Sequence, residues 1–348
     1  MSQPPIDVLG SGTVVLGKRI SCDGFHRDSA IRVQSHIHDD HMGDFSTSKG
    51  FQDVVLSEGT QALLVAEYDA EISARANGGN FYPLAPGEAH RHDGCAIYLL
   101  PNFHMLGSVQ TAVETSSGAR LGYSGDFAWP IDEAFQMRCD ALVVDATYGS
   151  PENVRQYTQG EAEAAFVEQA IAKLRCGPLH IKAHRGTIQR ALQLLSGEVD
   201  SPIISSDRLC REIGVYQQFG LAAGTVFAER SPDGRLALKN GRFIKLYSKG
   251  DQFPCEVVSG STIVLSAFMT SPDSPVLEYS PRACRVALSN HADFIGTLEY
   301  IEATGAKYVV TDNTRGGHAI RLAVAINERL GIDARPSSNT LSLEWGCG

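Results

Sequence analysis

The sequence predicts an α/β protein, and three observations support this fold class. Short apolar runs bounded by turn residues are typical of buried strands. An apolar stripe at helical spacing predicts a long amphipathic helix over residues 160–174. Strand-like runs dominate before residue 140, whereas strands and helices alternate after it, as in layered α/β folds. With 348 residues, the chain is long enough for two domains or for one with a large insertion.

Local patterns assign the individual elements. The clearest strands are predicted at residues 96–100, 141–144, 179–183, 262–266, 285–289 and 307–311. The helix over residues 160–174 begins after Thr158, which has capping-box spacing to Glu161, and ends at Gly177-Pro178. Further helices are predicted at residues 58–68, 187–195, 207–217, 294–302 and 319–330. The segment 228–250, with its turn sequence Ser231-Pro232-Asp233-Gly234, predicts a long flexible hairpin.

Composition narrows the class of protein. Hydrophobic residues make up 43% of the chain and charged residues 20%, as in ordinary globular proteins. We find no apolar run as long as a membrane span and no signal peptide at the N-terminus, so we expect a cytoplasmic protein without membrane contact. The eight scattered cysteines are expected to stay free thiols. The net charge of −10 argues against a broad basic surface, but a local groove with metals at its base stays compatible with it.

The most informative motif is the hexapeptide His36-Ile37-His38-Asp39-Asp40-His41, which has the spacing H-x-H-x-D-H. Imidazoles and carboxylates are ligands that suit zinc. If the segment turns just after a strand, His36 and His38 face one metal, and Asp40 and His41 face a second one. Such a two-metal site activates water and stabilises an oxyanion. The alternative is a polar surface loop, which rarely gathers four ligand-type residues at this spacing.

Three later residues complete this constellation. His104 follows the predicted strand 96–100, and His291 follows the strand that begins at residue 285. Asp126 lies between small residues at a strand end, where a carboxylate can bridge two metals. All three lie at the C-terminal edges of strands, where sites gather in layered α/β folds. Taken singly, each has a structural explanation as a hydrogen-bonded His or a capping Asp, but together they predict a dinuclear metal site.

The order of these motifs resembles the metallo-β-lactamase fold. After H-x-H-x-D-H come His104 in H-M-L-G-S and Asp126 in Y-S-G-D-F, and Asp23 in I-S-C-D-G resembles the first, structural Asp motif of that fold. Asp145 in D-A-T-Y-G and His291 in S-N-H-A-D resemble motifs A and B of the β-CASP branch, the nucleic-acid-processing nucleases. The resemblance therefore runs over most of the chain.

The resemblance implies a metallo-β-lactamase αββα sandwich with an inserted β-CASP α/β cap domain. The first part of the sandwich domain would span residues 1–149, the cap residues 150–282, and residues 283–348 would complete the sandwich. The segment 185–192 resembles the start of a cap helix. Lys182, His184, Arg185 and Arg190 are candidates for nucleic-acid backbone contacts, with a solvated helix start as the alternative.

The resemblance also implies a two-metal phosphodiesterase, with Zn²⁺ as the expected metal and Mn²⁺ as an alternative. His36, His38 and His104 would bind one metal; Asp40, His41 and His291 would bind the other; Asp126 would bridge them. A hydroxide held between the metals would attack phosphorus, and Asp40 would orient the attacking water. Asp145 would fix the tautomer of His291, and His291 or His318 would protonate the leaving oxygen.

The third β-CASP motif departs from the family pattern. RNA-processing members have a His after a strand, and DNA-repair members of the Artemis type have a Val; here Asp312 stands at that position, with His318 six residues later. Asp145 and the T-x-N context favour DNA, whereas H-A-D in motif B favours RNA. We expect a nuclease acting on single-stranded or end-containing DNA or RNA, with a DNA exonuclease slightly favoured.

Two other functions are compatible with the motifs. A metallo-β-lactamase-fold hydrolase of a lactone, thioester or cyclic nucleotide would use the same metals, although Asp145, His291 and the long insert argue against it. A non-catalytic scaffold paired with an active homologue would normally lose ligands, and this chain keeps them. Phe103 and Tyr148, beside His104 and Asp145, would either stack on bases or belong to the core. A homodimer would not be surprising.

Overall fold

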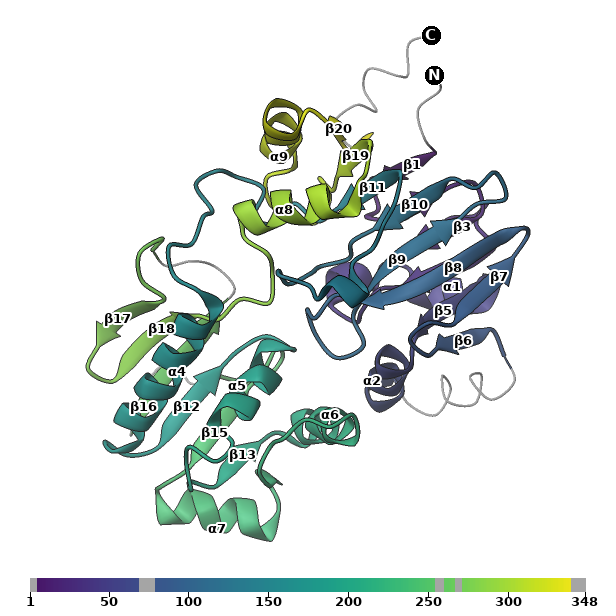
Figure 1. The fold of residues 1–348 in the computed structure, drawn as a ribbon. Coiled ribbons are helices and arrows are strands. Elements are labelled where there is room, and N and C mark those ends of the chain that lie inside the picture. Colours follow the sequence, from purple (N-terminus) through teal and green to yellow (C-terminus); the bar gives the residue numbers. More distant parts are fainter. Residues whose placement is uncertain (1–4, 69–78, 254–259, 267–270, 339–348) are drawn as a thin grey trace. The chain divides into compact units, whose positions relative to one another are not determined.

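The computed structural model describes residues 5–68, 79–253, 260–266 and 271–338. These residues form three mixed β-sheets and eight α-helices, which are distributed over two compact units. Unit 1 combines Met1–Val154 with His291–Gly348, and unit 2 is Arg155–Asn290 (Figure 1). Unit 2 is therefore an insertion in the chain of unit 1. None of the described helices is both long and apolar enough to cross a membrane.

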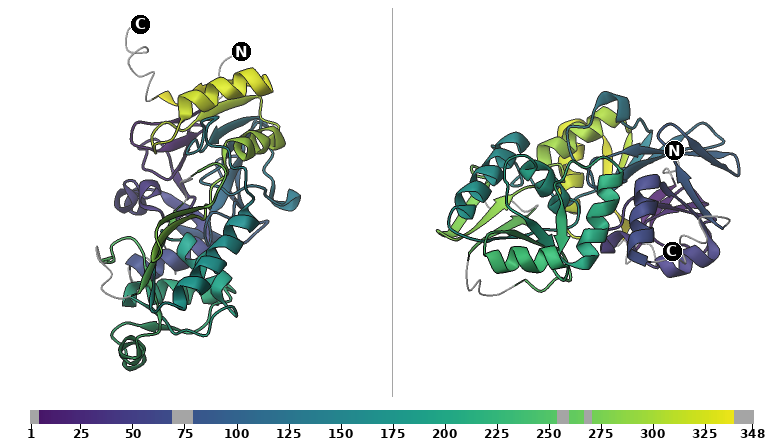
Figure 2. Two further views of the ribbon diagram at one scale, coloured as in Figure 1. Left: turned by 90° about the vertical axis from the view of Figure 1, so that its left-hand side faces the viewer. Right: turned by 90° about the horizontal axis from the view of Figure 1, so that it is seen from below.

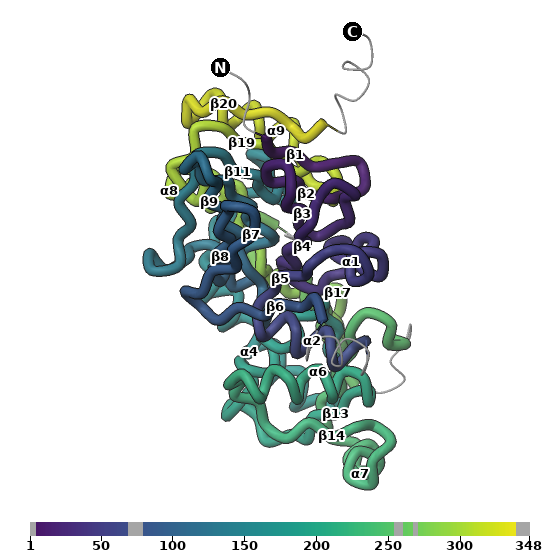
Figure 3. Tube along the Cα trace, turned by 90° about the vertical axis from the view of Figure 1, so that its right-hand side faces the viewer, coloured from purple at the N-terminus to yellow at the C-terminus, as the bar shows by residue number. Residues whose placement is uncertain are grey.

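Unit 1 contains two of the sheets. The first has the order β1-β2-β3-β4-β5-β6, which can be followed in Figure 3. Its strands are β1 (Ile6–Val8), β2 (Val14–Leu16), β3 (Ile20–Cys22), β4 (Ile31–Gln34), β5 (Asp53–Ser57) and β6 (Phe81–Leu84). The second sheet has the order β20-β19-β11-β10-β9-β8-β7. Its strands are β7 (Ala89–His92), β8 (Cys95–Pro101), β9 (Val109–Glu114), β10 (Arg120–Tyr123), β11 (Ala141–Val144), β19 (Tyr308–Thr311) and β20 (Asp333–Pro336).

Helices cover the outer faces of both sheets. On the first sheet, α1 (Phe45–Phe51) contacts β5, and α2 (Glu58–Tyr68) contacts β5 and β6. On the second sheet lie α8 (Phe294–Thr304) and α9 (Ala319–Ala325), and α9 contacts β19 and β20 (yellow in Figure 2). A π-helix, Ile326–Leu330, continues α9. Unit 1 thus consists of helix, sheet, sheet and helix layers.

Strand β11 shows why the central strands are continuously apolar. Val143 belongs to the core between the two sheets, with residues such as Val33 of β4. Its neighbours Leu142 and Val144 belong to the core under α8 and α9, with residues such as Phe294. Successive side chains of a strand point to opposite faces, and both faces of β11 are covered, so every position is buried.

Unit 2 is built around the third sheet, with the order β14-β13-β15-β12-β16-β18-β17. Its strands are β12 (Leu179–Lys182), β13 (Ile203–Ser205), β14 (Val226–Ala228), β15 (Ile244–Tyr247), β16 (Ser261–Ser266), β17 (Val276–Ser280) and β18 (Ala283–Ala287). All neighbouring strands are parallel except β17 and β18. The helices are α4 (Gln159–Leu174), α5 (Thr187–Leu195), α6 (Asp207–Gln218) and α7 (Pro232–Asn240). Crossover helices between parallel strands explain the alternating pattern seen in the sequence.

Most predicted elements are present, with ends shifted by one or two residues, and α4 has the predicted capping box between Thr158 and Glu161. The predicted hairpin over residues 228–250 is wrong. There, β14 is followed by α7 and then by β15. The Ser231 hydroxyl accepts a hydrogen bond from the Gly234 amide at 3.0 Å, Pro232 opens the helix, and Gly241 ends it with φ 71°. A turn-like sequence here is a helix start, because proline suits the first helical position.

Candidate metal centre

The hexapeptide lies where β4 leaves the first sheet of unit 1. Residues 35–38 belong to no strand or helix, His38 has an extended backbone, and Asp39–His41 then form one turn of 3-10 helix. The turn closes through a hydrogen bond from the His41 amide to the His38 carbonyl at 2.9 Å. This reversal brings Asp40 and His41 back towards the side chains of His36 and His38. The imidazoles of His36 and His41 are almost completely buried.

A first set of donor atoms converges on one point. Nδ1 of His38 lies 3.2 Å from Nε2 of His36 and 3.0 Å from Nε2 of His104. Oδ2 of Asp126 lies 3.6 Å from Nε2 of both His36 and His104. Ligands about 2.0–2.1 Å from a zinc ion at the corners of a tetrahedron are about 3.3 Å apart. These four separations are close to that value, and all four donor atoms lie within 4.8 Å of one another, so the set has the chemistry and the approximate spacing of a metal site.

A second set of donors adjoins the first and shares Asp126 with it. Nε2 of His41 faces Oδ1 of Asp126 at 3.2 Å and Oδ2 of Asp40 at 3.7 Å. Nε2 of His291 lies 3.9 Å from Oδ2 of Asp126. Nε2 of His41 is buried, yet it makes no hydrogen bond within the described residues. A buried polar atom without a hydrogen bond is costly, so this donor fits a bound cation.

Three imidazoles of the cluster, those of His36, His41 and His291, are oriented through their second nitrogen. Nδ1 of His41 lies 2.7 Å from Oδ2 of Asp23, and the Tyr123 hydroxyl donates to the same oxygen at 3.0 Å. Nδ1 of His36 lies 2.9 Å from the Ser35 hydroxyl. Nδ1 of His291 lies 3.1 Å from Oδ2 of Asp145. Such partners fix the tautomer and turn the other nitrogen towards a metal.

Electrostatics prepares the first donor set for a metal. Burial, together with the neighbouring His104, lowers the pKa of His38 to about 3. Burial also holds the pKa of His36 well below its usual range, although Asp126 opposes this effect. Both imidazoles are therefore neutral at physiological pH, which is the form that binds a metal.

Replacing Asp145 by Asn is expected to lower metal affinity about 10- to 100-fold. An amide is a weaker acceptor than a carboxylate for the Nδ1–H of His291, so this imidazole loses its fixed orientation. Metal titration of the purified variant checks the effect. Asp93→Asn, in the exposed turn between β7 and β8, is the matched control and should behave as wild type. Unchanged affinity in Asp145→Asn would contradict the role of His291 as a metal donor oriented by Asp145.

The metal-free protein is expected to lose stability as the pH rises from about 6.5 to about 10. Burial disfavours charge on His41, but Asp126 and Asp23 outweigh burial and raise the pKa of His41 to about 10. The unfolded pKa is about 6.5, so the stabilisation is complete below that pH and is lost as the pH passes the folded-state pKa. Denaturant unfolding of chelated protein over this range tests the slope; a flat profile would refute it.

The structure places Asp312, the residue at the third motif position, in a buried ion pair. Its carboxylate binds the Arg315 guanidinium and accepts a hydrogen bond from the Thr314 amide at 2.8 Å. Arg315 also donates from Nε to the Asp40 carbonyl oxygen at 3.2 Å and from Nη2 to the Gly12 carbonyl oxygen. The sequence motifs do not identify Arg315. Its local context is the run Thr-Arg-Gly-Gly, which begins two residues after Asp312.

Not every predicted residue joins the cluster. The His318 amide donates to the Ala146 carbonyl, but no hydrogen bond or ion pair joins its exposed imidazole to the cluster in the described residues. In unit 2, Lys182 and His184 are exposed. Arg185 lies 3.1 Å from a Glu212 oxygen, and Arg190 forms a two-point ion pair with Glu163. Both arginines therefore support helix packing within the unit, which leaves Lys182 and His184 as the more open candidates.

The two aromatic residues beside the cluster have different environments. Tyr148 is 6% exposed, as expected for a core residue. Phe103, in contrast, is 52% exposed, so its assignment to the core is wrong. Its backbone is left-handed, with φ 60°, a conformation that costs a non-glycine residue about 1–3 kcal/mol.

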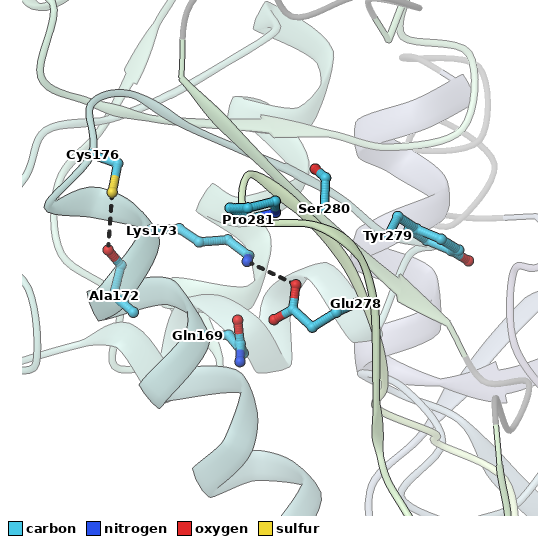
Figure 4. A pocket seen from close by; sticks show the side chains of 8 residues that line it. All are labelled: Gln169, Ala172, Lys173, Cys176, Glu278, Tyr279, Ser280 and Pro281. Carbon is cyan, nitrogen blue, oxygen red and sulfur yellow. Dashed lines mark hydrogen bonds and ion pairs between the residues drawn. The ribbon is translucent and has the colours of Figure 1, made fainter.

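A pocket of about 600 Å³ lies in unit 2, and its lining contains none of the predicted site residues. It is lined by Gln169, Ala172, Lys173 and Cys176 of the α4 region and by Glu278, Tyr279, Ser280 and Pro281 at the end of β17 (Figure 4). Lys173 faces Glu278, with Nζ 3.4 Å from a carboxylate oxygen. The two charges compensate each other, and the pocket adds no donor to the metal cluster.

Comparison with known proteins gives distant relatives. No protein-family model matches the chain. It is 31% identical over 126 residues to an "Uncharacterized protein in lig 3'region" of Acidianus ambivalens, across 36% of this chain and 89% of that protein. It is 26% identical over 320 residues to a "Probable DNA ligase" of Opitutus terrae, across 90% of this chain but only 29% of that protein's length. A crystal structure of a protein of unknown function from Enterococcus faecalis V583 is similar, with a TM-score of 0.58, 11% identity, and coverage of 82% and 76% of the two chains.

Proposed function

The chain belongs to the same family as the uncharacterized protein in the lig 3′ region of Acidianus ambivalens, and we propose that it is a metal-dependent nuclease that acts on DNA. The observation that carries this proposal is the convergence of donor atoms from His36, His38, His104 and Asp126, with His41 and His291 beside them. This donor set suits two divalent ions, most simply Zn²⁺, which share the Asp126 carboxylate.

The layers of unit 1 support a metallo-β-lactamase fold. Helix, sheet, sheet and helix follow one another, and the donors lie in loops that follow β4, β8, β10 and β18. The parallel sheet of unit 2, inserted before His291, supports a β-CASP cap. The similarity to the Enterococcus faecalis structure shows a shared chain fold and carries no argument about function.

DNA is the proposed substrate class because of the second relative. A protein described as a probable DNA ligase contains a region that is similar to 90% of this chain. The net charge of −10 argues against a long basic track for the DNA backbone. Cations held by the cluster would instead supply the positive charge that attracts a phosphate. Single strands or strand ends suit such a local site better than an intact duplex does.

The residues of the cluster have separable roles in the proposed hydrolysis. Bound divalent ions supply positive charge that acidifies water and stabilises the charge developing at phosphorus. The Asp40 side chain is 56% exposed, so its carboxylate can orient the attacking water and accept its proton. Asp145 holds His291 through Nδ1, so that Nε2 points to Asp126. The exposed imidazole of His318 stays a candidate for protonating the leaving oxygen.

The first test is a degradation assay on single- and double-stranded DNA and RNA, each with a 5′-phosphate or a 5′-hydroxyl, with zinc or manganese added. We expect cleavage of DNA, which is lost in His38→Ala. Preferred cleavage of RNA would correct the substrate class. No cleavage of any strand by protein that holds about two metals per chain would overturn the proposal and favour a small-molecule hydrolase.

A further inference from the structure

We propose that Phe103 forms a stacking platform for a nucleobase of the substrate strand beside the metal centre. The inference rests on the proposed function, because a platform of this kind requires a nucleic-acid substrate. The Phe103 side chain is not a metal donor. It is exposed, whereas its neighbours Asn102 and His104 are buried. Stacking on an aromatic ring is how proteins bind single strands without reading their sequence, since every base offers a π-face.

The position of Phe103 follows from its neighbours in the loop after β8. Asn102 is fully buried, and its side-chain amide donates to the Ser124 carbonyl oxygen at 3.0 Å. The Asn102 carbonyl oxygen accepts a hydrogen bond from the Ala128 amide at 3.0 Å. His104 is 3% exposed and is one of the metal donors. The chain is thus held on both sides, and the residue between them takes the left-handed conformation and an exposed position.

A phenylalanine is an unexpected residue in this conformation. The other described non-glycine residues with positive φ are Asp23, Asp44 and Asp93, and short polar side chains tolerate the left-handed region well. A bulky ring is disfavoured there, and in this case burial does not compensate for it because the ring is 52% exposed. Strain of this kind is typical of functional sites, which points to a ligand that covers the ring.

The ring is also held in place rather than being a loose surface group. Its centroid lies 5.8 Å from that of Phe135, at an interplanar angle of 67°. Phe135 ends a short 3-10 turn, Glu133–Phe135, whose preceding residue Asp132 accepts a hydrogen bond from Ala134 at 2.9 Å. The Phe135 carbonyl oxygen accepts from the buried Gln110 side chain at 2.9 Å. An edge-to-face contact with a supported partner orients Phe103 and costs little freedom on binding.

The position of Phe103 next to His104 in the chain indicates which chemical group would cover the ring. Phe103 directly precedes the metal donor His104 in the chain, so a molecule bound at the donors passes close to the backbone that carries the ring. In a DNA strand, the group nearest to a scissile phosphate that offers a flat apolar face is the nucleobase. A base stacked on Phe103 would hold the strand while its phosphate lies at the metal donors. We therefore expect the ring to raise affinity for single strands with little preference for sequence.

The test compares Phe103→Ala and Phe103→Trp with wild type on three substrates. These are a single-stranded DNA, the same strand with three baseless nucleotides at each end, and bis(p-nitrophenyl) phosphate, which contains no base. We expect Phe103→Ala to lower kcat/KM about 5- to 150-fold on the intact strand only, and Phe103→Trp to retain activity. Phe51→Ala, which removes an 80%-exposed ring from α1, is the matched control and should behave as wild type.

Binding provides a readout that does not depend on cleavage. A strand carrying 2-aminopurine at its end is titrated with His38→Ala protein, with and without Phe103→Ala. Stacking should quench the fluorescence only when Phe103 is present. Equal losses of kcat/KM on all three substrates would show that Phe103 merely shapes the His104 loop, and no loss on any would exclude stacking. If Phe103→Ala cleaves strands as well as wild type does, this inference alone is overturned. If the wild-type protein neither cleaves nor binds any strand, the proposed function is overturned as well.

Discussion

Replacing Asp126 by Asn is expected to abolish nuclease activity, with kcat at least about 10³-fold lower, while the protein stays folded. The carboxylate is the group that both donor sets share, because its oxygens face His36 and His104 at 3.6 Å, His41 at 3.2 Å and His291 at 3.9 Å. Asn has the same shape but lacks the negative charge that two cations would share. Loss of such electrostatic stabilisation amounts to several kcal/mol, and each 1.36 kcal/mol is a factor of ten in rate.

Three measurements on Asp126→Asn separate this effect from unfolding. Metal analysis should show fewer bound ions per chain, circular dichroism should show an unchanged fold, and the degradation assay should show no product above that of His38→Ala. Asp140→Asn is the matched control, because Asp140 lies directly before β11, is exposed, and accepts a hydrogen bond from the Arg120 amide at 2.9 Å. Wild-type kcat in Asp126→Asn at normal metal content would show that the cluster is not the active site.

Replacing Arg315 by Met is expected to lower the free energy of unfolding by about 3–5 kcal/mol, the usual effect of removing one partner of a buried ion pair. The variant leaves the Asp312 carboxylate buried without its counter-charge. It also removes the donors to the carbonyl oxygens of Asp40 and Gly12. Because Asp40 belongs to the second donor set, metal affinity should fall together with stability.

A double-mutant cycle shows whether the pair acts as a unit. Asp312→Asn combined with Arg315→Met should cost less than the sum of the single variants, since neither charge is then left alone. Arg120→Met is the matched control, because Arg120 is 57% exposed and lies 3.8 Å from Glu114; it should change stability by at most about 1 kcal/mol. Denaturant unfolding of the four proteins provides the free energies. Arg315→Met with wild-type stability would exclude a structural role for the pair.

The candidate ligands could be predicted from the sequence because they belong to short motifs in a recognisable context. The hexapeptide follows β4, and His104 and Asp126 lie just after β8 and β10, all at positions where apolar runs end. Histidine and aspartate at this spacing suit a metal whatever their packing, so these candidates can be named from the sequence. The structure then adds the geometry, such as the use of Nδ1 by His38 and of Nε2 by His36 and His104.

Other features could not be predicted, and in each case local sequence was a poor guide. The sequence at residues 231–234 suits a helix start as well as a turn, and the helix is supported by the packing of Ala237 against Ile204 of β13 and against Phe243, which precedes β15. The ion pairs of Arg185 with Glu212 of α6 and of Arg190 with Glu163 of α4 have no local signal in the sequence. The sequence leaves both base stacking and a place in the core open for Phe103, because nothing local shows that its neighbours hold it outside.

The candidate ligand types, the order of the metal motifs, and the alternation of strands and helices can be read from the residues. They depend on side-chain chemistry and on periodicity over a few residues. Which partners surround the candidate ligands depends on how distant segments pack. Tyr123 reaches Asp23 across 100 positions, and Arg315 reaches the Asp40 carbonyl across 275. Contacts of this kind leave no local pattern, since the energy that selects them comes from burying polar groups together when distant segments pack.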